Sequence, residues 1–222
     1  MISRRNRTWL GVGAAVLAAS LSACGGAPEP TEGPSPDNPA GVKVSGVDQD
    51  VSFNGSEPAR PYTMPDITLH ATTGGDFNLV TDTPGPVTLV FFGYTHCPDV
   101  CPLVMSDLTS AYLQLPDSVR DQTQVLVITT DPARDTAGVL HSWLERYNDS
   151  FVGLTGKLST IKAAATGMGV AISGTKKLPS GGYDVGHSSQ VIGFAGNTAP
   201  VIWTVGTPVP DMVSDITELA GQ

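Results

Sequence analysis

Two cysteines separated by three residues are the side chains in this sequence best suited to chemistry. Cys97 and Cys101 lie in FFGYTHCPDVCP, residues 91–102, and each precedes a proline. Because a residue before proline disfavours the α region, we expect a loop here, with Pro98-Asp99 in the middle of a β-turn. A helix should then begin at Pro102, with its free N–H groups and positive dipole end facing the sulfurs. Lowered pKa values are therefore expected for both thiols.

Two adjacent sulfurs at a strand-to-helix junction support three kinds of chemistry. They can close a structural disulfide, exchange disulfides with a partner, or bind a soft metal, and composition alone does not choose among these. Thiolates suit Cu(I), and an added imidazole suits Cu(I) or Cu(II), while zinc remains possible on ligand type. A peroxiredoxin-like peroxidase is a further reading of a reactive cysteine.

Other potential ligands near the cysteines have simpler explanations. His96 adjoins Cys97, but neighbouring residues of an extended chain face opposite sides, so we expect it to point away. Met105 follows Cys101 by four residues, and a methionine on a helix usually fills the core. His70 and His141 are expected to be solvated.

Apolar runs predict the elements that position the cysteines. Continuous runs at 87–92 and 124–130 indicate strands buried on both faces. Short runs around Gly-containing turns predict two hairpins, 67–69 with 77–79 and 190–194 with 201–205. Further helices are predicted after the possible N-cap oxygens of Asp135 and Thr136, over 159–168, and over 211–220. The apolar stripe of the first of these comprises Val139, Leu140, Trp143, Leu144 and Tyr147. Asp131, Arg134 and Asp135 are interpreted as a strand-end turn and helix cap.

The N-terminal residues are typical of an export signal. Three arginines precede an apolar run from Trp9 to Ala19, which is about the length of a secretory signal and too short to span a bilayer. The run ends in Leu-Ser-Ala-Cys at 21–24, which resembles the bacterial lipobox, so residues 1–23 are predicted to be a lipoprotein signal peptide. Residues 24–50, rich in Pro, Gly and acids, are predicted to be a flexible tether with a lipidated Cys24. The predicted folded domain is 51–222, at the extracytoplasmic face of the bacterial cell membrane.

Charge excludes one class of partner. The 222 residues carry 12 Lys and Arg against 21 Asp and Glu, a net charge of −9, and no basic run follows the first seven residues. Nucleic-acid binding needs a clustered basic face, so it is not expected.

Three segments together resemble one known family. FFGYTHCPDVCP, then VLVITTDPARDT at 125–136 and YDVGHSS at 183–189, resemble the Sco/SenC family of copper-binding assembly factors for cytochrome oxidase. The resemblance extends over about 66–219. It implies an α/β, thioredoxin-like fold with a central mixed sheet flanked by helices, and here an extra N-terminal hairpin.

The resemblance also implies the ligands and the task. Cys97, Cys101 and His187 match the family's copper ligands, while Gly186 stands where an aspartate is often found and Gly196-Asn197 replaces an Asp-Gly turn. The implied function is a membrane-anchored copper chaperone that assists assembly of the CuA centre in cytochrome c oxidase subunit II. Other copper carriers or thiol reductases are expected partners. The alternative is a thiol–disulfide oxidoreductase that uses Cys97 and Cys101 to keep a copper-protein partner reduced.

Overall fold

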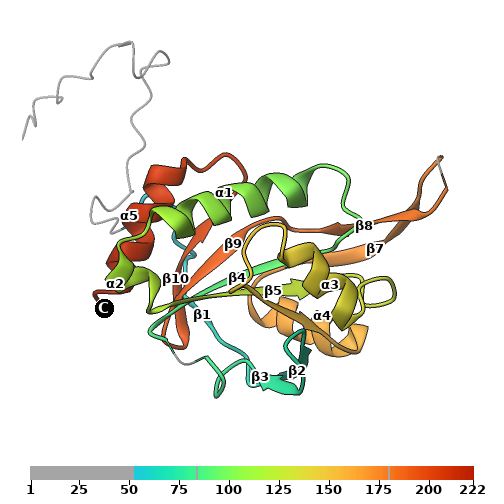
Figure 1. Cartoon of the computed structure of the whole chain (residues 1–222), viewed down its shortest axis with the longest axis horizontal. Coiled ribbons are helices and arrows are strands. Elements are labelled where there is room, and N and C mark those ends of the chain that lie inside the picture. Colours follow the sequence, from blue (N-terminus) through green and yellow to red (C-terminus); the bar gives the residue numbers. More distant parts are fainter. Residues whose placement is uncertain (1–52, 84, 180) are drawn as a thin grey trace, which may run out of the picture. The chain divides into compact units, whose positions relative to one another are not determined.

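An eight-stranded mixed sheet lies at the centre of the fold (Figure 1), which is described by a computed structural model for residues 53–83, 85–179 and 181–222. The strands are β1 (Tyr62–Thr63), β2 (Thr68–Ala71), β3 (Asp76–Asn78), β4 (Val87–Gly93), β5 (Thr123–Thr129), β6 (Val152–Thr155), β7 (Ile172–Lys177), β8 (Tyr183–His187), β9 (Val191–Ala195) and β10 (Thr198–Trp203). The helices are α1 (Val100–Gln114), α2 (Asp117–Arg120), α3 (Ala137–Leu144), α4 (Leu158–Gly167) and α5 (Val209–Leu219).

The strand order places the predicted apolar strands in the middle of the sheet. The order is β1-β10-β9-β4-β5-β6-β2-β3, in which β4, β5 and β6 are parallel and the other pairs are antiparallel. All seven residues of β4 are buried, which confirms the strand predicted at 87–92. Because successive side chains face opposite sides, Leu89 and Phe91 join one core and Val90 and Phe92 the other.

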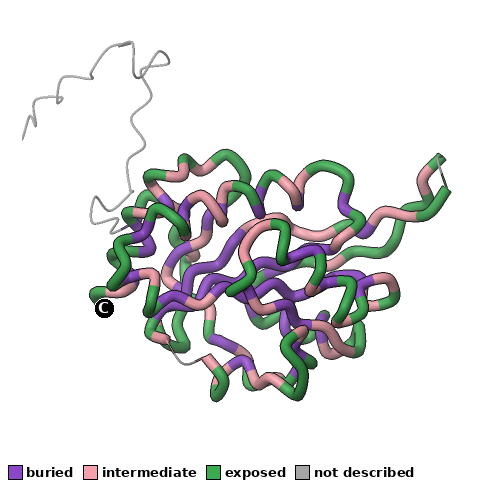
Figure 2. The backbone as a smooth tube through the Cα atoms, viewed as in Figure 1, coloured by how far each residue is buried: buried purple, intermediate pink, exposed green. Residues whose placement is uncertain are grey.

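Helices cover both faces of the sheet. Buried side chains of α1, α3 and α5 belong to the core that contains Phe91, whereas those of α4 belong to the core that contains Phe92. Figure 2 shows the buried residues concentrated along the central strands. The stripe predicted for α3 is buried at Leu140, Trp143 and Leu144, but Val139 is 42% exposed, so that part of the prediction is wrong.

The first helix begins earlier than predicted. It starts at Val100 rather than Pro102, so Cys101 lies in its first turn and not in a loop. The Asp99 carboxylate accepts a hydrogen bond from the Val100 amide and so caps the helix. Pro102 is tolerated because the first-turn amides have no acceptor within the helix, so a missing N–H costs nothing there.

Both predicted hairpins are present, and a third was not predicted. In β2 and β3, Leu69 pairs with Phe77, and this hairpin extends the sheet beyond β6. The β9–β10 hairpin turns through Gly196, whose φ is +54°. The unpredicted β7 and β8 form a separate two-stranded sheet. Strand β7, ISGTKK, is exposed at nearly every position and lacks the alternation that would predict a strand.

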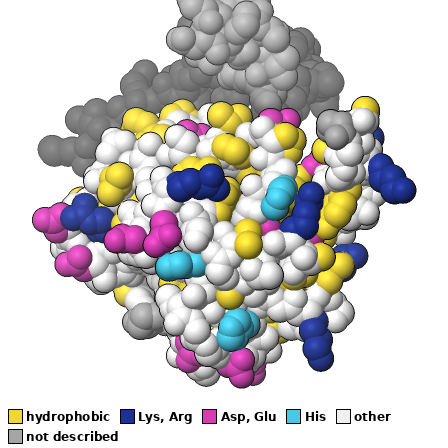
Figure 3. Space-filling view, turned by 45° about the vertical axis from the view of Figure 1, so that its right-hand side comes forward, with side chains coloured by type: hydrophobic (Ala, Val, Ile, Leu, Met, Phe, Trp, Pro, Cys, Tyr) yellow, Lys and Arg dark blue, Asp and Glu magenta, His cyan; other side chains and the backbone are white. Residues whose placement is uncertain are grey.

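The predicted signal peptide, lipidated Cys24 and tether lie outside the described residues. Among the helices of the described residues, none combines the length and the hydropathy that a membrane span requires. On the face shown in Figure 3, the basic side chains lie apart from one another and form no continuous stripe.

Candidate metal centre

Three side chains from three segments meet at one edge of the central sheet. Cys97 follows the end of β4, Cys101 lies in the first turn of α1, and His187 is the last residue of β8. Their ligand atoms all lie within 4.8 Å of one another, and Cys101 Sγ is 3.5 Å from His187 Nε2. The two cysteines are free thiols and are buried, and the imidazole is half-buried. The fold therefore brings together the three residues that the sequence singled out.

The two thiols have opposite environments. Cys97 Sγ accepts a hydrogen bond from the Cys101 side chain, is close to His187, and lies 3.3 Å from the Cys101 amide. Chiefly through the Cys101 hydrogen bond, the pKa of Cys97 falls to about 4. The donated hydrogen bond and burial raise the pKa of Cys101 instead. The expectation of two lowered pKa values is thus wrong for Cys101, because a paired thiolate needs a protonated donor beside it.

The imidazole of His187 is oriented for metal binding. Its Nδ1 lies 2.8 Å from the carbonyl oxygen of Ser188. A carbonyl can only accept, so Nδ1 donates to it, and Nε2 is the ring nitrogen that faces the sulfurs. Edge-on contacts with Tyr94, at 5.6 Å between ring centroids, and with Phe91, at 6.4 Å, hold the ring. A backbone carbonyl bonded to the far nitrogen is the usual support of a metal-binding histidine.

Tyr94 packs against the His187 ring and bonds the strand that carries it, a role that the sequence did not reveal. It is 1% exposed, its hydroxyl bonds Asp184 Oδ1, and the Val185 amide donates to it over 3.4 Å. Burial and the bond to Asp184 raise the pKa of Tyr94. The YTHC run could not signal this contact, because Asp184 is 90 residues away along the chain.

Gly186, before His187, departs from the family pattern, in which an aspartate is often found. The hydroxyl of Ser173 occupies the space that a side chain at Gly186 would take. A Cβ at Gly186 would lie 2.1 Å from the hydroxyl oxygen of Ser173 on the neighbouring strand. A larger side chain at Gly186 therefore requires Ser173 to rotate away.

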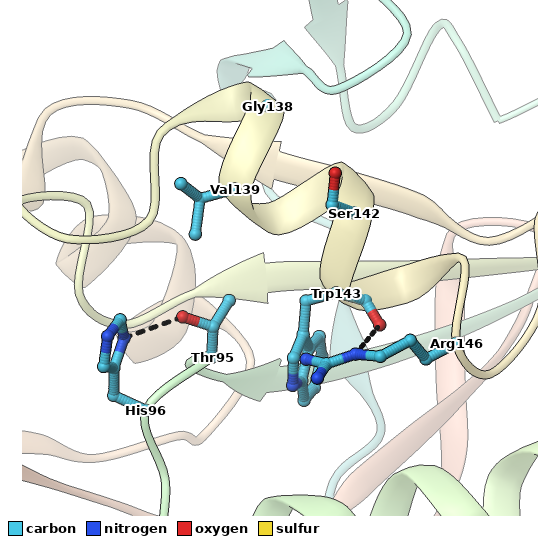
Figure 4. Close-up of a pocket in the computed structure, with 7 residues that line it drawn as sticks. All are labelled: Thr95, His96, Gly138, Val139, Ser142, Trp143 and Arg146. Carbon is cyan, nitrogen blue, oxygen red and sulfur yellow. Dashed lines mark hydrogen bonds between the residues drawn. The ribbon is translucent and has the colours of Figure 1, made fainter.

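His96 lies apart from the three-residue cluster, as predicted. Among the described residues, the group able to hold a metal comprises the two cysteines and His187. The His96 ring is exposed, and its Nδ1 lies 2.9 Å from Thr95 Oγ1. It borders an open hollow of about 540 Å³ that is also lined by Trp143 of α3 and by Arg146, which follows the end of that helix (Figure 4).

The other histidines and Met105 lie outside the three-residue cluster. Met105 is completely buried, which confirms core filling, and His70 is exposed, as expected. His141 is partly exposed and lies 3.6 Å from Glu145.

The helix cap after β5 is Thr136 and not Asp135. The Thr136 hydroxyl accepts from the Val139 amide. Asp135 is instead fully buried and accepts from the amide and hydroxyl of Thr95 and from the hydroxyl of Thr129. It therefore ties the segment that leads into Cys97 to the end of β5.

Known proteins share both the sequence pattern and the fold. A family model described as SCO1/SenC matches residues 58–220. A candidate copper-binding protein of Stutzerimonas stutzeri is 37% identical over 103 residues, which make up 46% of this chain and 50% of that protein. The matched stretch spans half or less of the curated relatives' length.

Solved structures have a similar fold. Yeast Sco1 with copper bound has a TM-score of 0.61 at 26% identity, covering 75% of this chain and 87% of that one. BsSco, described as a member of the Sco family of cytochrome c oxidase assembly proteins, has a TM-score of 0.58 at 22% identity, covering 75% and 97%. The fold is thioredoxin-like, as predicted, and because the family model matches nearly the whole described region, the chain belongs to the SCO1/SenC family.

Proposed function

We propose that this chain is a copper chaperone that binds one copper ion through Cys97, Cys101 and His187. The observation that carries the proposal is the convergence of two sulfurs and one imidazole nitrogen within 4.8 Å. The copper-bound structure of yeast Sco1, which has the same fold, supports copper as the metal.

The chemistry of the three groups fits copper in both oxidation states. Thiolates favour Cu(I), and the imidazole adds a ligand that Cu(II) also accepts. Cys97 is already a thiolate at neutral pH, whereas Cys101 must lose its proton when the metal binds, so loading releases a proton. Three ligands leave room for an incoming ligand to attack the metal, which favours transfer over permanent storage.

The proposal includes a place and a partner. A signal peptide at 1–23, a lipidated Cys24, a tether at 24–50 and a domain at 51–222 would hold the protein at the extracytoplasmic face of the bacterial cell membrane. There it would assist assembly of the CuA centre in cytochrome c oxidase subunit II, and other copper carriers or thiol reductases would serve it. The lipobox-like residues 21–24 support the membrane anchor, and the family assignment supports the role in oxidase assembly.

Copper titration of single variants tests the ligand set. Cys97→Ala and Cys101→Ala should abolish tight binding, and His187→Ala should weaken Cu(II) binding most, because the remaining sulfurs favour Cu(I). The matched control is His96→Ala, which removes an imidazole next to Cys97 but outside the cluster and should bind like the wild type. Undiminished binding by Cys97→Ala rejects the site.

A second candidate function is thiol–disulfide exchange that keeps a copper-protein partner reduced. The difference between the two cysteines favours it, since Cys97 is a thiolate and Cys101 retains its proton. Exchange should require both cysteines and tolerate His187→Ala, unlike copper binding. A reduction potential far below that of the compartment supports a reductant role, and a potential above it argues against one.

A further inference from the structure

The strand that carries His187 is not part of the central sheet. Strands β7 and β8 pair only with each other among the described strands, and β7 is largely exposed. Figure 1 shows this hairpin extending away from the body. An exposed two-stranded ribbon is marginally stable by itself, so side-chain contacts with the body must determine where His187 lies.

One such contact joins β8 to the loop after β5. The Tyr183 hydroxyl donates to Asp131 Oδ1 over 2.9 Å, while Asp131 Oδ2 pairs with Arg134 Nε. The guanidinium carbon of Arg134 lies 3.8 Å from the centroid of the Tyr183 ring. Carboxylate, guanidinium and phenol thus form a closed set of three contacts, which we call the Arg134 clamp.

The carboxylate of the clamp is shielded from water, while Arg134 and Tyr183 are partly exposed. Asp131 is only 4% exposed, so its bonds are screened little by solvent. The Nη2 atom of Arg134 is buried without a hydrogen-bond partner in the described part of the chain. The guanidinium lies over Tyr183 and is 5.7 Å from the centroid of Tyr94, so aromatic faces take the place of such partners.

Two structural connections link the clamp to His187, one along β8 and one through the side chain of Tyr94. Tyr183, Val185 and His187 are every second residue of β8, so their side chains lie on the same side of the strand. Val185, between the other two, is buried. Through space, Tyr94 contacts both the Arg134 guanidinium and the His187 ring. Fixing Tyr183 therefore sets the direction in which β8 delivers the imidazole.

We propose that Arg134, with Asp131 and Tyr183, is a positioning group that holds β8 so that the imidazole of His187 stays over the two thiols. This inference rests on the proposed copper function. Losing such supporting contacts typically costs about 10-fold to 100-fold in metal affinity. The loss should be larger for Cu(II) than for Cu(I), because the sulfurs alone retain Cu(I).

The test compares three variants of the full chain with one control. Arg134→Gln removes the charge, Arg134→Lys keeps the charge without the flat stacking surface, and Tyr183→Phe keeps the ring without the bond to Asp131. Lys176→Gln is the matched control, since it removes an exposed charge from the same hairpin. We expect about a 10-fold or greater loss of Cu(II) affinity for Arg134→Gln, incomplete rescue by Arg134→Lys, and no change for the control.

Two further readouts separate positioning from general damage. In the metal-free protein, NMR of the His187 ring should show greater mobility in Arg134→Gln than in the wild type. In a His187→Ala background, Arg134→Gln should cost no further copper affinity, since there is no imidazole left to position.

The inference is overturned if Arg134→Gln leaves both the Cu(II) affinity and the mobility of the His187 ring unchanged. It is also overturned if Arg134→Gln lowers copper affinity as much in the His187→Ala background as in the wild type. If Arg134→Gln does not fold, Tyr183→Phe decides by the same readouts. Failure of the copper function itself is seen separately, as undiminished copper binding by Cys97→Ala, and the NMR measurement on the metal-free protein still tests the clamp.

Discussion

At the scale of single residues, the chemistry depends on an asymmetry between two cysteines that look alike in sequence. Cys101 donates its proton toward Cys97 and also offers its backbone amide from the first turn of α1. One thiol thus becomes a thiolate while its neighbour stays protonated. This prepares the pair for a metal that replaces one proton or for a disulfide that needs one nucleophile.

We predict that Cys97 titrates near pH 4 in the reduced, metal-free protein. The ultraviolet absorbance of its thiolate should appear there, and Cys101→Ala should move the midpoint upward because it removes the largest cause of the shift. Cys97→Ala supplies the baseline. A first thiol midpoint near the ordinary value of 9.0 contradicts the prediction.

The same titration makes stability depend on pH. Between about pH 4 and 9.0 the folded Cys97 holds fewer protons than the unfolded chain, so stability should rise with pH across this interval. Above it, the raised pKa of Cys101 acts in the opposite direction, so its contribution is lost as pH rises. Denaturant unfolding of the wild type and Cys97→Ala at several pH values measures the difference.

We predict that Asp135→Asn destabilises the protein by about 1–3 kcal/mol, since an amide cannot accept all the hydrogen bonds that the buried carboxylate receives. Denaturant unfolding measures the loss, with the exposed Asp149→Asn as control. An equal effect of both substitutions would show that the tie to Thr95 adds little.

At the scale of elements, helix ends position the backbone around the core. Helix α4 ends in a Schellman motif, in which the Val170 amide donates to the Ala165 carbonyl and the Gly169 amide to the Thr166 carbonyl. Gly169 has φ of +68°, and a Cβ there would lie 2.3 Å from the Tyr62 ring. The end of α4 and the edge strand β1 therefore depend on this one glycine.

We predict that Gly169→Ala lowers the free energy of unfolding by about 2 kcal/mol, through the left-handed backbone and the contact with Tyr62. Gly174→Ala is the control, because no atom lies within 4 Å of its Cβ position. Thermal unfolding compares the two, and equal melting temperatures would contradict the prediction.

In the folded domain as a whole, residues 54–56 bind the C-terminal part of the described chain through hydrogen bonds to α5 and β10. Asp215 of α5 is 1% exposed and accepts from both nitrogens of Asn54, from the Gly55 amide and from Trp203 Nε1. Ser56 also exchanges two backbone hydrogen bonds with Ile202 of β10. Residues 53–56 are therefore part of the fold, although the family match begins at residue 58.

We predict that Asp215→Asn costs at least about 2 kcal/mol of stability, since it leaves buried donors without an acceptor. It should also make the chain near Asn54 more sensitive to limited proteolysis. Glu218→Gln, an exposed change on the same helix, is the control. Wild-type resistance to both denaturant and protease in Asp215→Asn would refute the role of this carboxylate.

The local pattern predicted those parts of the fold whose signals lie within a few residues. Strands β4 and β5 were predicted because their apolar runs are short, nearly continuous and next to turn residues, which favours a buried strand. Strands β7 and β8 were missed because few of their side chains are buried, and Asp135 was misassigned because its partner Thr95 is 40 residues away.

The kinds of ligand, two closely spaced sulfurs and a later imidazole, can be read from the residue types alone, because these are set before folding. The approach of His187 to within 3.5 Å of a sulfur 86 residues away, and the loss of the proton from Cys97 rather than from Cys101, are properties of the folded chain. Distance and pKa depend on packing and on hydrogen bonds between distant segments, which local periodicity does not encode.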